Sequence, residues 1–362
     1  MAAPPQLSGF AAELGVSART LRRDIAWLGA NGYDVRIDRG RVRYVRAKSD
    51  SIGDGAPPST SFGRGFVGRS EELDAALEDL TLAAAGNPRI LVVSGEAGVG
   101  KTSFVDQITD IVASRGFVVA GGRATLDDGA PGFWPLKQVI RSLTDHHKKG
   151  GPGDISKAGT ELVSELMPDS ASPGRGRPSN DHELHAIRFG IFDAVARFLS
   201  DSAAVNPIVL AIDDMQWADS GTLDMVRHLS NSLDHGQILM AVTIRDGEAN
   251  DAGQLRRTLA ELAHRRGHRR IALSGLAKDG VARLVENRTR QPGHPAVIDY
   301  VHAHTGGNPF FVRELVEHLI SHGFMDAGNI EDLNALRVPV PESVQDILEA
   351  RLRSLSSDTV MF

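Results

Sequence analysis

The stretch of sequence that decides the fold of this chain reads Gly95-Glu96-Ala97-Gly98-Val99-Gly100-Lys101-Thr102. It fits the pattern G-x-x-x-x-G-K-[ST] and stands between an apolar run, residues 90–93, and a segment with helical spacing, residues 102–108. Glycines let backbone N–H groups turn toward phosphate oxygens, and the positive end of the helix dipole adds to that attraction. The order of strand, glycine loop and helix therefore predicts a phosphate-binding P-loop. The pattern alone would leave a chance glycine-rich turn as the alternative.

The side chains of this loop have different expected roles. We expect the Lys101 ammonium to reach the β- and γ-phosphates of a nucleotide and the Thr102 hydroxyl to hold Mg²⁺. The residues expected to bind the nucleotide here are Gly95, Glu96, Ala97, Gly98, Val99, Gly100, Lys101, Thr102 and Ser103.

A second apolar run, residues 207–212, ends in two carboxylates, Asp213 and Asp214. A nucleotide-hydrolysing site needs one carboxylate for the metal and one for the attacking water. We assign Asp213 to Mg²⁺ and Asp214 to the water. The alternative is an acidic turn that caps the next helix, but Asp219 is better placed as the N-cap before Ser220.

A third apolar run, residues 238–244, ends in Arg245. An arginine at a strand end beside the γ-phosphate would stabilise the transferring charge. The alternative is an exposed arginine that begins a loop. The predicted catalytic set is thus Lys101, Asp213, Asp214 and Arg245.

Composition limits the class of protein. The 362 residues include no cysteine, which excludes disulfides, thiolate zinc sites and cysteine nucleophiles and suits a reducing cytoplasm. No apolar run approaches the ~20 residues of a membrane span, and the first residues lack the pattern of a signal peptide. Residues 1–50 carry nine Lys/Arg against five Asp/Glu, whereas the remainder carries 31 against 41. Any affinity for nucleic acid is therefore expected at the N-terminus.

Four segments are expected along the chain. Residues 1–47 form a small winged helix-turn-helix of α+β type, and 48–64 form a polar linker rich in Gly, Ser and Pro. Residues 65–275 form an α/β P-loop NTPase domain with a parallel sheet. Residues 276–362 form a helical lid and the start of a truncated following domain. The expected strands are 89–94, 117–120, 207–212, 237–244 and 270–273, and residues 146–181 are expected to be a loose insertion around one short helix.

The N-terminal unit has the pattern helix, glycine turn, helix, then a basic hairpin around residues 38–40. Gly15 supplies the turn and Ser17 the N-cap of the second helix. The residues expected to face duplex DNA are Ser17, Arg19, Thr20, Arg22, Arg23, Arg39 and Arg41. The unit resembles the winged helix-turn-helix of DeoR-type bacterial repressors, although the usual first helix has no room before Leu7. The alternative is a basic helical cap that docks on the ATPase domain.

Five motifs occur in order and carry a second resemblance, which covers roughly residues 66–356. They are Phe66–Leu73, the P-loop, Ile212–Asp219, Thr243–Arg245 and Thr305–Phe311. Together they resemble the AAA-type ATPase module of the signal-transduction (STAND) ATPases found in large LuxR-family regulators. The resemblance implies that Gly68 and Arg69 lie by the adenine and ribose, and that Gly307 and Pro309 of the lid touch the base. It also implies a switch that is closed with ADP, and open and self-associating with ATP.

Two features depart from that family. No arginine finger for a neighbouring subunit is evident, which argues against hydrolysis of the ring type. The chain stops after Ser357-Asp358-Thr359-Val360-Met361-Phe362, where such proteins continue into a winged-helix domain and a sensor region. We therefore expect a truncated gene or a fragment of a longer regulator.

Two further patterns are interpreted as structural. The histidine pairs, such as His146-His147, have no cysteine partners and no His-Glu-x-x-His spacing, so solvated surface histidines are favoured over a metal site. The basic run Arg265–Arg270 could bind nucleic acid, but a solvated edge before a buried strand is the more common role.

These observations favour a cytoplasmic, ATP-binding and slowly hydrolysing transcription regulator that needs Mg²⁺ and binds duplex DNA through its N-terminal unit. The alternative is an AAA-type ATPase that remodels DNA or protein complexes, like origin-recognition or clamp-loading proteins. A binding module without chemistry is a third class, and the presence of Lys101, Asp213 and Asp214 argues against it.

Overall fold

The computed structural model describes residues 35–38, 41–44, 66–126, 131–150, 153–166, 181–246 and 253–321. The chain divides into two compact units, Met1–Ser59 and Thr60–Phe362. In the first unit, β1 (Val35–Asp38) pairs antiparallel with β2 (Arg41–Tyr44), with Val35 opposite Tyr44. This is the hairpin that the alternation of the sequence predicts. The preceding helix-turn-helix prediction and Arg39 lie outside the described residues.

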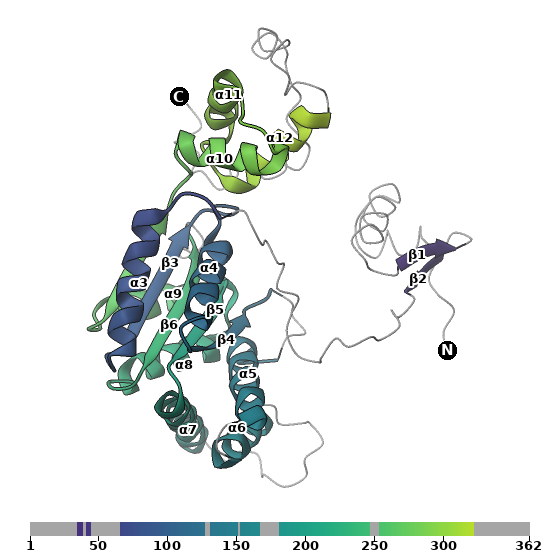
Figure 1. Cartoon of the computed structure of the whole chain (residues 1–362). Coiled ribbons are helices and arrows are strands. Elements are labelled where there is room, and N and C mark those ends of the chain that lie inside the picture. The colour runs from purple at the N-terminus through teal and green to yellow at the C-terminus, as the bar shows by residue number, and fades with distance from the viewer. Residues whose placement is uncertain are drawn as a thin grey trace. The chain divides into compact units, whose positions relative to one another are not determined.

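The second unit is built around a five-stranded sheet (Figure 1). Its strands are β3 (Arg89–Gly95), β4 (Val118–Arg123), β5 (Ile208–Asp213), β6 (Ile238–Arg245) and β7 (His268–Leu273). Their spatial order is β4-β5-β6-β3-β7 and every pairing is parallel. The α/β parallel sheet predicted from the apolar runs is therefore confirmed. Parallel strands end at the same edge, which gathers the segments that follow β3, β5 and β6.

Alternate residues of the central strands supply two hydrophobic cores, as expected for a sheet covered on both faces. One face packs on α3 (Ser70–Ala84) and α4 (Lys101–Ala113), and the strands contribute residues such as Leu91 and Val93 to the core between them. The other face packs on α5 (Trp134–Gly150), α7 (Asp181–Val205), α8 (Ser220–Ser232) and α9 (Gly253–Ala263). Asp219 accepts a hydrogen bond from Thr222 N at 3.0 Å, so it is the N-cap of α8 as predicted.

The segment expected to be a loose insertion is more ordered than its composition indicates. Residues 146–150 complete α5, and α6 (Gly153–Leu166) packs against α5 and α7. Close contact explains this: a Cβ on Gly159 would lie 2.1 Å from Thr144 Oγ1, so the small residue lets the two helices approach. The polar residues 146–150 are thus helical and not part of a loose segment.

Three helices follow the last strand, namely α10 (Lys278–Thr289), α11 (Pro295–Thr305) and α12 (Pro309–Ser321). They enclose their own small core of Val, Leu and Ile side chains, against which Val67 also packs. Figure 1 shows this helical group at the end of the sheet where α4 begins. Among the described residues, no helix combines the length and the apolar character that crossing a membrane requires.

Candidate nucleotide-binding site

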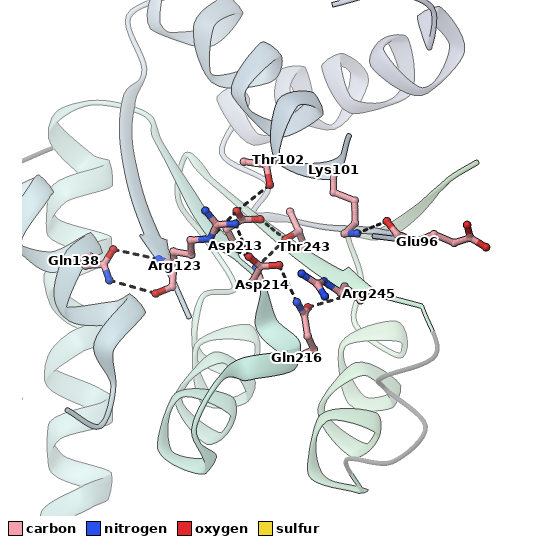
Figure 2. A network of polar contacts seen from close by, with 10 residues as sticks. All are labelled: Glu96, Lys101, Thr102, Arg123, Gln138, Asp213, Asp214, Gln216, Thr243 and Arg245. Carbon is pink, nitrogen blue, oxygen red and sulfur yellow. Dashed lines mark hydrogen bonds and ion pairs between the residues drawn. The ribbon is translucent and has the colours of Figure 1, made fainter. Parts of the chain in front are cut away.

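The register of the sheet places the predicted residues side by side. Gly95 is opposite Arg245 on β6, and Arg123 on β4 is opposite Asp213 on β5. Figure 2 shows the polar side chains at these strand ends converging below the start of α4. The P-loop, both carboxylates and Arg245 therefore share one edge of the sheet, as their positions after buried strands indicate.

The P-loop has the backbone geometry that a phosphate cradle requires. Gly95, Gly98 and Gly100 all have positive φ angles, of 154°, 76° and 97°. A Cβ on Gly95 would lie 2.6 Å from the carbonyl oxygen of Leu273, so no other residue fits there. Because α4 begins at Lys101, its first N–H groups open toward the loop.

Lys101 is 7% exposed and lies over this loop. Its Nζ donates to the carbonyl oxygens of Gly95 at 2.9 Å and Glu96 at 2.8 Å. Burial lowers the pKa of Lys101, and the nearby Arg245 charge lowers it further, whereas Asp213 and Asp214 act in the opposite direction. The ammonium is thus held at the mouth of the loop beside Asp213 and Asp214, which we call the acid pair.

Two oxygen ligands suited to Mg²⁺ lie next to each other. Thr102 Oγ1 donates to Asp213 Oδ2 at 3.0 Å, and Thr243 donates from its hydroxyl to the other oxygen of Asp213. Mg²⁺ in phosphate sites commonly takes one or two protein oxygens and completes its shell with water and phosphate. The donor set fits that ion. No group of three or more His, Asp or Glu side chains in the described ranges could hold a metal alone.

Asp214 is 4% exposed and makes four hydrogen bonds to three residues. Its backbone is left-handed, with φ 59°, and its N–H donates to Thr243 Oγ1 at 2.9 Å. Oδ1 accepts from Gln216 Nε2 at 2.8 Å. Oδ2 accepts from Arg123 Nε at 2.9 Å and Nη2 at 2.7 Å. Both carboxylate oxygens therefore already have partners.

Arg123 was not among the predicted site residues. The strand expected at 117–120 runs in fact to Arg123, and this longer strand delivers the guanidinium to the acid pair. Gln138 of α5 fixes its backbone, accepting from Arg123 N at 3.2 Å and donating to Arg123 O at 3.3 Å. Burial would lower the pKa of Arg123, but the hydrogen bond to Asp214 and the charge of Asp213 raise it overall. The signal that could have found it is an arginine at the carboxyl end of a strand, the same signal that identified Arg245.

Arg245 lies with its guanidinium carbon 4.4 Å from the centre of the Trp217 ring. Its backbone N–H donates to Gln216 Oε1 at 3.1 Å. Gln216 and Trp217 belong to the short turn η1 (Met215–Trp217), which follows the acid pair directly. Gln216 therefore connects Asp214 to the end of β6.

Helices α10 to α12, the expected lid, contact the P-loop through residues near those for which the family resemblance implies contact with the base. Asn308 Nδ2 donates to Ala97 O at 2.9 Å, and Phe310 N donates to Gly98 O at 3.3 Å. A Cβ on Gly98 would lie 2.7 Å from Phe310 Cβ, so the two segments touch. Gly307 O accepts from Leu276 N at 2.8 Å, and Pro309 begins α12.

Arg69 connects the beginning of the domain to the same loop. It has a left-handed backbone, like Gly68, and its Nη2 donates to Val99 O and Ser274 O, both at 2.8 Å. Burial lowers its pKa, and Glu72 at 3.6 Å acts against that shift. Arg69 thus supports the P-loop by direct bonds. The predicted contact of Gly68, Arg69, Gly307 and Pro309 with adenine and ribose remains a prediction.

The other predicted residues are placed as follows. Glu96, Ala97 and Gly98 are exposed on the loop, Ser103 is exposed on α4, and Val99 is buried. The last three residues of the basic run Arg265–Arg270 lie in β7, and the run forms ion pairs: Arg269 Nε lies 2.6 Å from the buried Asp79, and Arg270 Nη2 lies 3.3 Å from Asp246. Of the predicted DNA-facing residues only Arg41 falls in a described segment, β2.

Comparison with known proteins identifies the class of this domain. Residues 65–242 match the family model of the AAA ATPase domain. The chain thus contains an AAA ATPase domain, with its nucleotide-binding P-loop at residues 95–102.

Individual relatives are distant. An uncharacterized protein of Rhizobium meliloti (strain 1021) is 23% identical over 316 residues, which are 81% of this chain but 28% of that protein. A STAND protein of Pyrococcus horikoshii with a tetratricopeptide repeat sensor has a TM-score of 0.40 at 16% identity, over 77% of this chain and 38% of that chain. The ORC1 protein of Aeropyrum pernix, solved in complex with DNA, has a TM-score of 0.41 at 15% identity, over 81% of this chain and 69% of that chain.

Proposed function

We propose that this chain binds ATP with Mg²⁺, hydrolyses it slowly, and uses the nucleotide state as a regulatory switch. The observation that carries the proposal is the meeting of the P-loop and the acid pair, in which Thr102 Oγ1 lies 3.0 Å from Asp213 Oδ2. This juxtaposition joins a phosphate cradle to a metal-binding carboxylate, which is the combination that phosphoryl transfer needs.

The roles of the residues follow from their positions. The P-loop N–H groups, the start of α4 and Lys101 bind the phosphates. Thr102 and Asp213 would hold Mg²⁺, which when bound neutralises part of the phosphate charge. Water attacks the γ-phosphorus, the bond from that phosphorus to the bridging oxygen breaks, ADP leaves, and Asp214 accepts the proton of the water. Arg245 stabilises the charge on the transferring group.

Slow turnover is supported by the environment of Asp214. Its Oδ2 accepts two hydrogen bonds from Arg123 and its Oδ1 accepts one from Gln216. The attacking water therefore has to use the remaining acceptor position on Oδ1 or displace one of these donors. A long-lived ATP state is what a switch requires.

The regulatory partner that we propose is duplex DNA, bound in the cytoplasm by residues 1–47. The positive charge of residues 1–50 and the β1–β2 hairpin support a winged helix-turn-helix there. We further propose that the ATP state self-associates. The alternative is an ATPase that remodels DNA or protein complexes.

The rate of ATP hydrolysis with and without duplex DNA distinguishes these functions. Slow hydrolysis that DNA leaves unchanged, with ADP retained through purification, is expected for the switch. Strong stimulation by DNA would favour the remodelling ATPase. If Mg²⁺-ATP does not bind at all, both proposals are wrong.

A further inference from the structure

The turn after the acid pair contains two side chains that the proposed hydrolysis does not use. Gln216 bonds to Asp214 on one side, through Nε2 at 2.8 Å, and to the backbone N–H of Arg245 on the other, through Oε1 at 3.1 Å. Trp217 is half-buried, and its ring faces the Arg245 guanidinium at 4.4 Å. The turn therefore contacts Arg245 twice, once at the backbone and once at the side chain.

These two contacts restrain different parts of Arg245. The bond from Gln216 fixes the Arg245 backbone at the end of β6, opposite Gly95 of the P-loop. The ring contact restrains only the guanidinium, and a cation–π contact at a half-exposed site is weaker than a charge-assisted hydrogen bond to phosphate. A γ-phosphate in the P-loop can therefore draw the guanidinium off the ring. A diphosphate offers no group in that position.

We propose that Trp217 is a positioning residue that holds the Arg245 guanidinium on its ring, at the end of β6, until a γ-phosphate binds the guanidinium in place of the ring. The inference rests on the proposed function and adds a specific device to it. Stacking on Trp217 favours the diphosphate state, because the contact has to be given up when the triphosphate binds. Trp217 thereby sets how strongly the site distinguishes ATP from ADP.

Tryptophan fluorescence tests the movement directly in the full chain. The chain has three tryptophans, Trp27, Trp134 and Trp217, so W27F with W134F leaves Trp217 as the only reporter. We expect saturating Mg²⁺-ADP to leave its emission unchanged and a non-hydrolysable ATP analogue with Mg²⁺ to change it. Adding R245Q should abolish the difference. Unchanged emission with calorimetrically confirmed binding of the analogue would overturn the inference, and so would a change that persists in R245Q.

Equilibrium binding gives a second readout. Trp217→Leu should raise the affinity for the ATP analogue about twofold to fivefold and leave that for ADP unchanged, because the ring contact no longer competes. Trp217→Phe keeps an aromatic face and should have a smaller effect. Trp134→Leu is the matched control, since Trp134 is also half-buried but lies on α5. If both nucleotides bind and their affinity ratio is the same in Trp217→Leu, the inference is wrong although the proposed function stands. If neither nucleotide binds to the unmodified chain, both are wrong.

Discussion

At the scale of single residues, the environment of Asp214 governs the chemistry. In the proposed hydrolysis this carboxylate accepts a proton from water, yet Arg123 and Gln216 already donate to both of its oxygens. The hydroxyl of Thr243 adds a further constraint, because it binds Asp213 and the Asp214 backbone together. The acid pair is thus held firmly, and we expect the proposed hydrolysis to speed up when Asp214 loses a partner.

Arg123→Ala tests this dependence. We expect a several-fold faster basal hydrolysis of ATP with little change in ATP affinity, because Asp214 loses one partner while the P-loop is intact. The Arg123 side chain is 61% exposed, so its loss should cost at most about 1 kcal/mol of stability. Steady-state hydrolysis at saturating Mg²⁺-ATP measures the effect. Asp214→Asn is the reference that should abolish hydrolysis and keep binding; an equally inactive Arg123→Ala would mean that Arg123 acts in the reaction itself.

At the scale of elements, the lid helices contact the P-loop through one turn. Asn308 is 5% exposed and donates to Ala97 O, and Phe310 N donates to Gly98 O. The start of α12 therefore lies over the exposed side of the phosphate loop. Nucleotide release should be coupled to the opening of this contact.

Asn308→Ala removes the side-chain part of that contact. We expect ADP to dissociate about tenfold faster. The variant loses the bond to Ala97, worth about 1 kcal/mol, and also the bond from Phe310 N to Asn308 Oδ1 that orders this turn. Stopped-flow release of a fluorescent ADP derivative measures the rate. Asn287→Ala, an exposed position on α10, is the control and should release ADP at the unmodified rate. An unchanged rate in Asn308→Ala would show that the lid contact does not limit release.

Helix α5 carries a titratable group in its buried face. His147 is 3% exposed, its Nε2 contacts Ser202 Oγ at 3.1 Å, and its Nδ1 has no hydrogen-bond partner. Burial and the neighbouring His146 lower the pKa of His147. The folded protein therefore favours the neutral ring, and this stability is present above the unfolded pKa of about 6.5 and is lost as the pH falls below it.

His147→Gln should reduce the loss of stability between pH 7 and pH 5. Urea unfolding at several pH values measures the free energy of unfolding at each. His146→Gln, at the exposed neighbouring position, is the control and should keep most of the pH dependence. An identical pH dependence in His147→Gln and the unmodified chain would show that the ring titrates normally.

The elements also show what could be predicted from the sequence. The apolar runs indicate that Asp213 and Arg245 end strands, and both do, so the parallel sheet brings them to one edge. Their catalytic roles remain predictions. Arg123 was missed because Gly121 and Gly122 end the apolar pattern before the strand itself ends. The lid contact of Asn308 could not be predicted, since it depends on how a distant turn meets Ala97. The helical conformation of residues 146–150 and the packing of α6 on α5 differ from the expected loose insertion, because polar composition does not reveal packing between helices.

At the scale of the whole molecule, the chain joins an AAA ATPase domain to a basic N-terminal unit. The formal net charge is −6, yet residues 1–50 are positive. The proposed electrostatic binding of DNA is therefore expected at the first unit. The communication between the two units remains part of the proposed function.

Replacing Arg22 and Arg23 together with Ala tests the DNA-binding half. We expect weaker binding to duplex DNA and a slope of log affinity against log salt that is shallower by about one to two, since each lost phosphate contact removes roughly 0.9. Fluorescence anisotropy over a range of salt concentrations measures both. The control is Arg256→Ala with Arg257→Ala, an exposed pair on α9. If residues 1–50 show no salt-dependent affinity for DNA, this half of the proposal is wrong.

The central claim is that Gly95–Thr102 binds ATP with Mg²⁺, and the most direct measurement is calorimetric titration of ATP with Mg²⁺ into the full chain and into Lys101→Ala. Lys101 Nζ bonds only to carbonyl oxygens of the loop among the contacts described, so the fold should survive its loss, as the thermal midpoint without nucleotide will show. We expect saturable binding by the unmodified chain and an affinity at least tenfold to a hundredfold weaker in Lys101→Ala, because a charge-assisted bond to phosphate is lost. Equal affinity in the two proteins would contradict the assignment of the site.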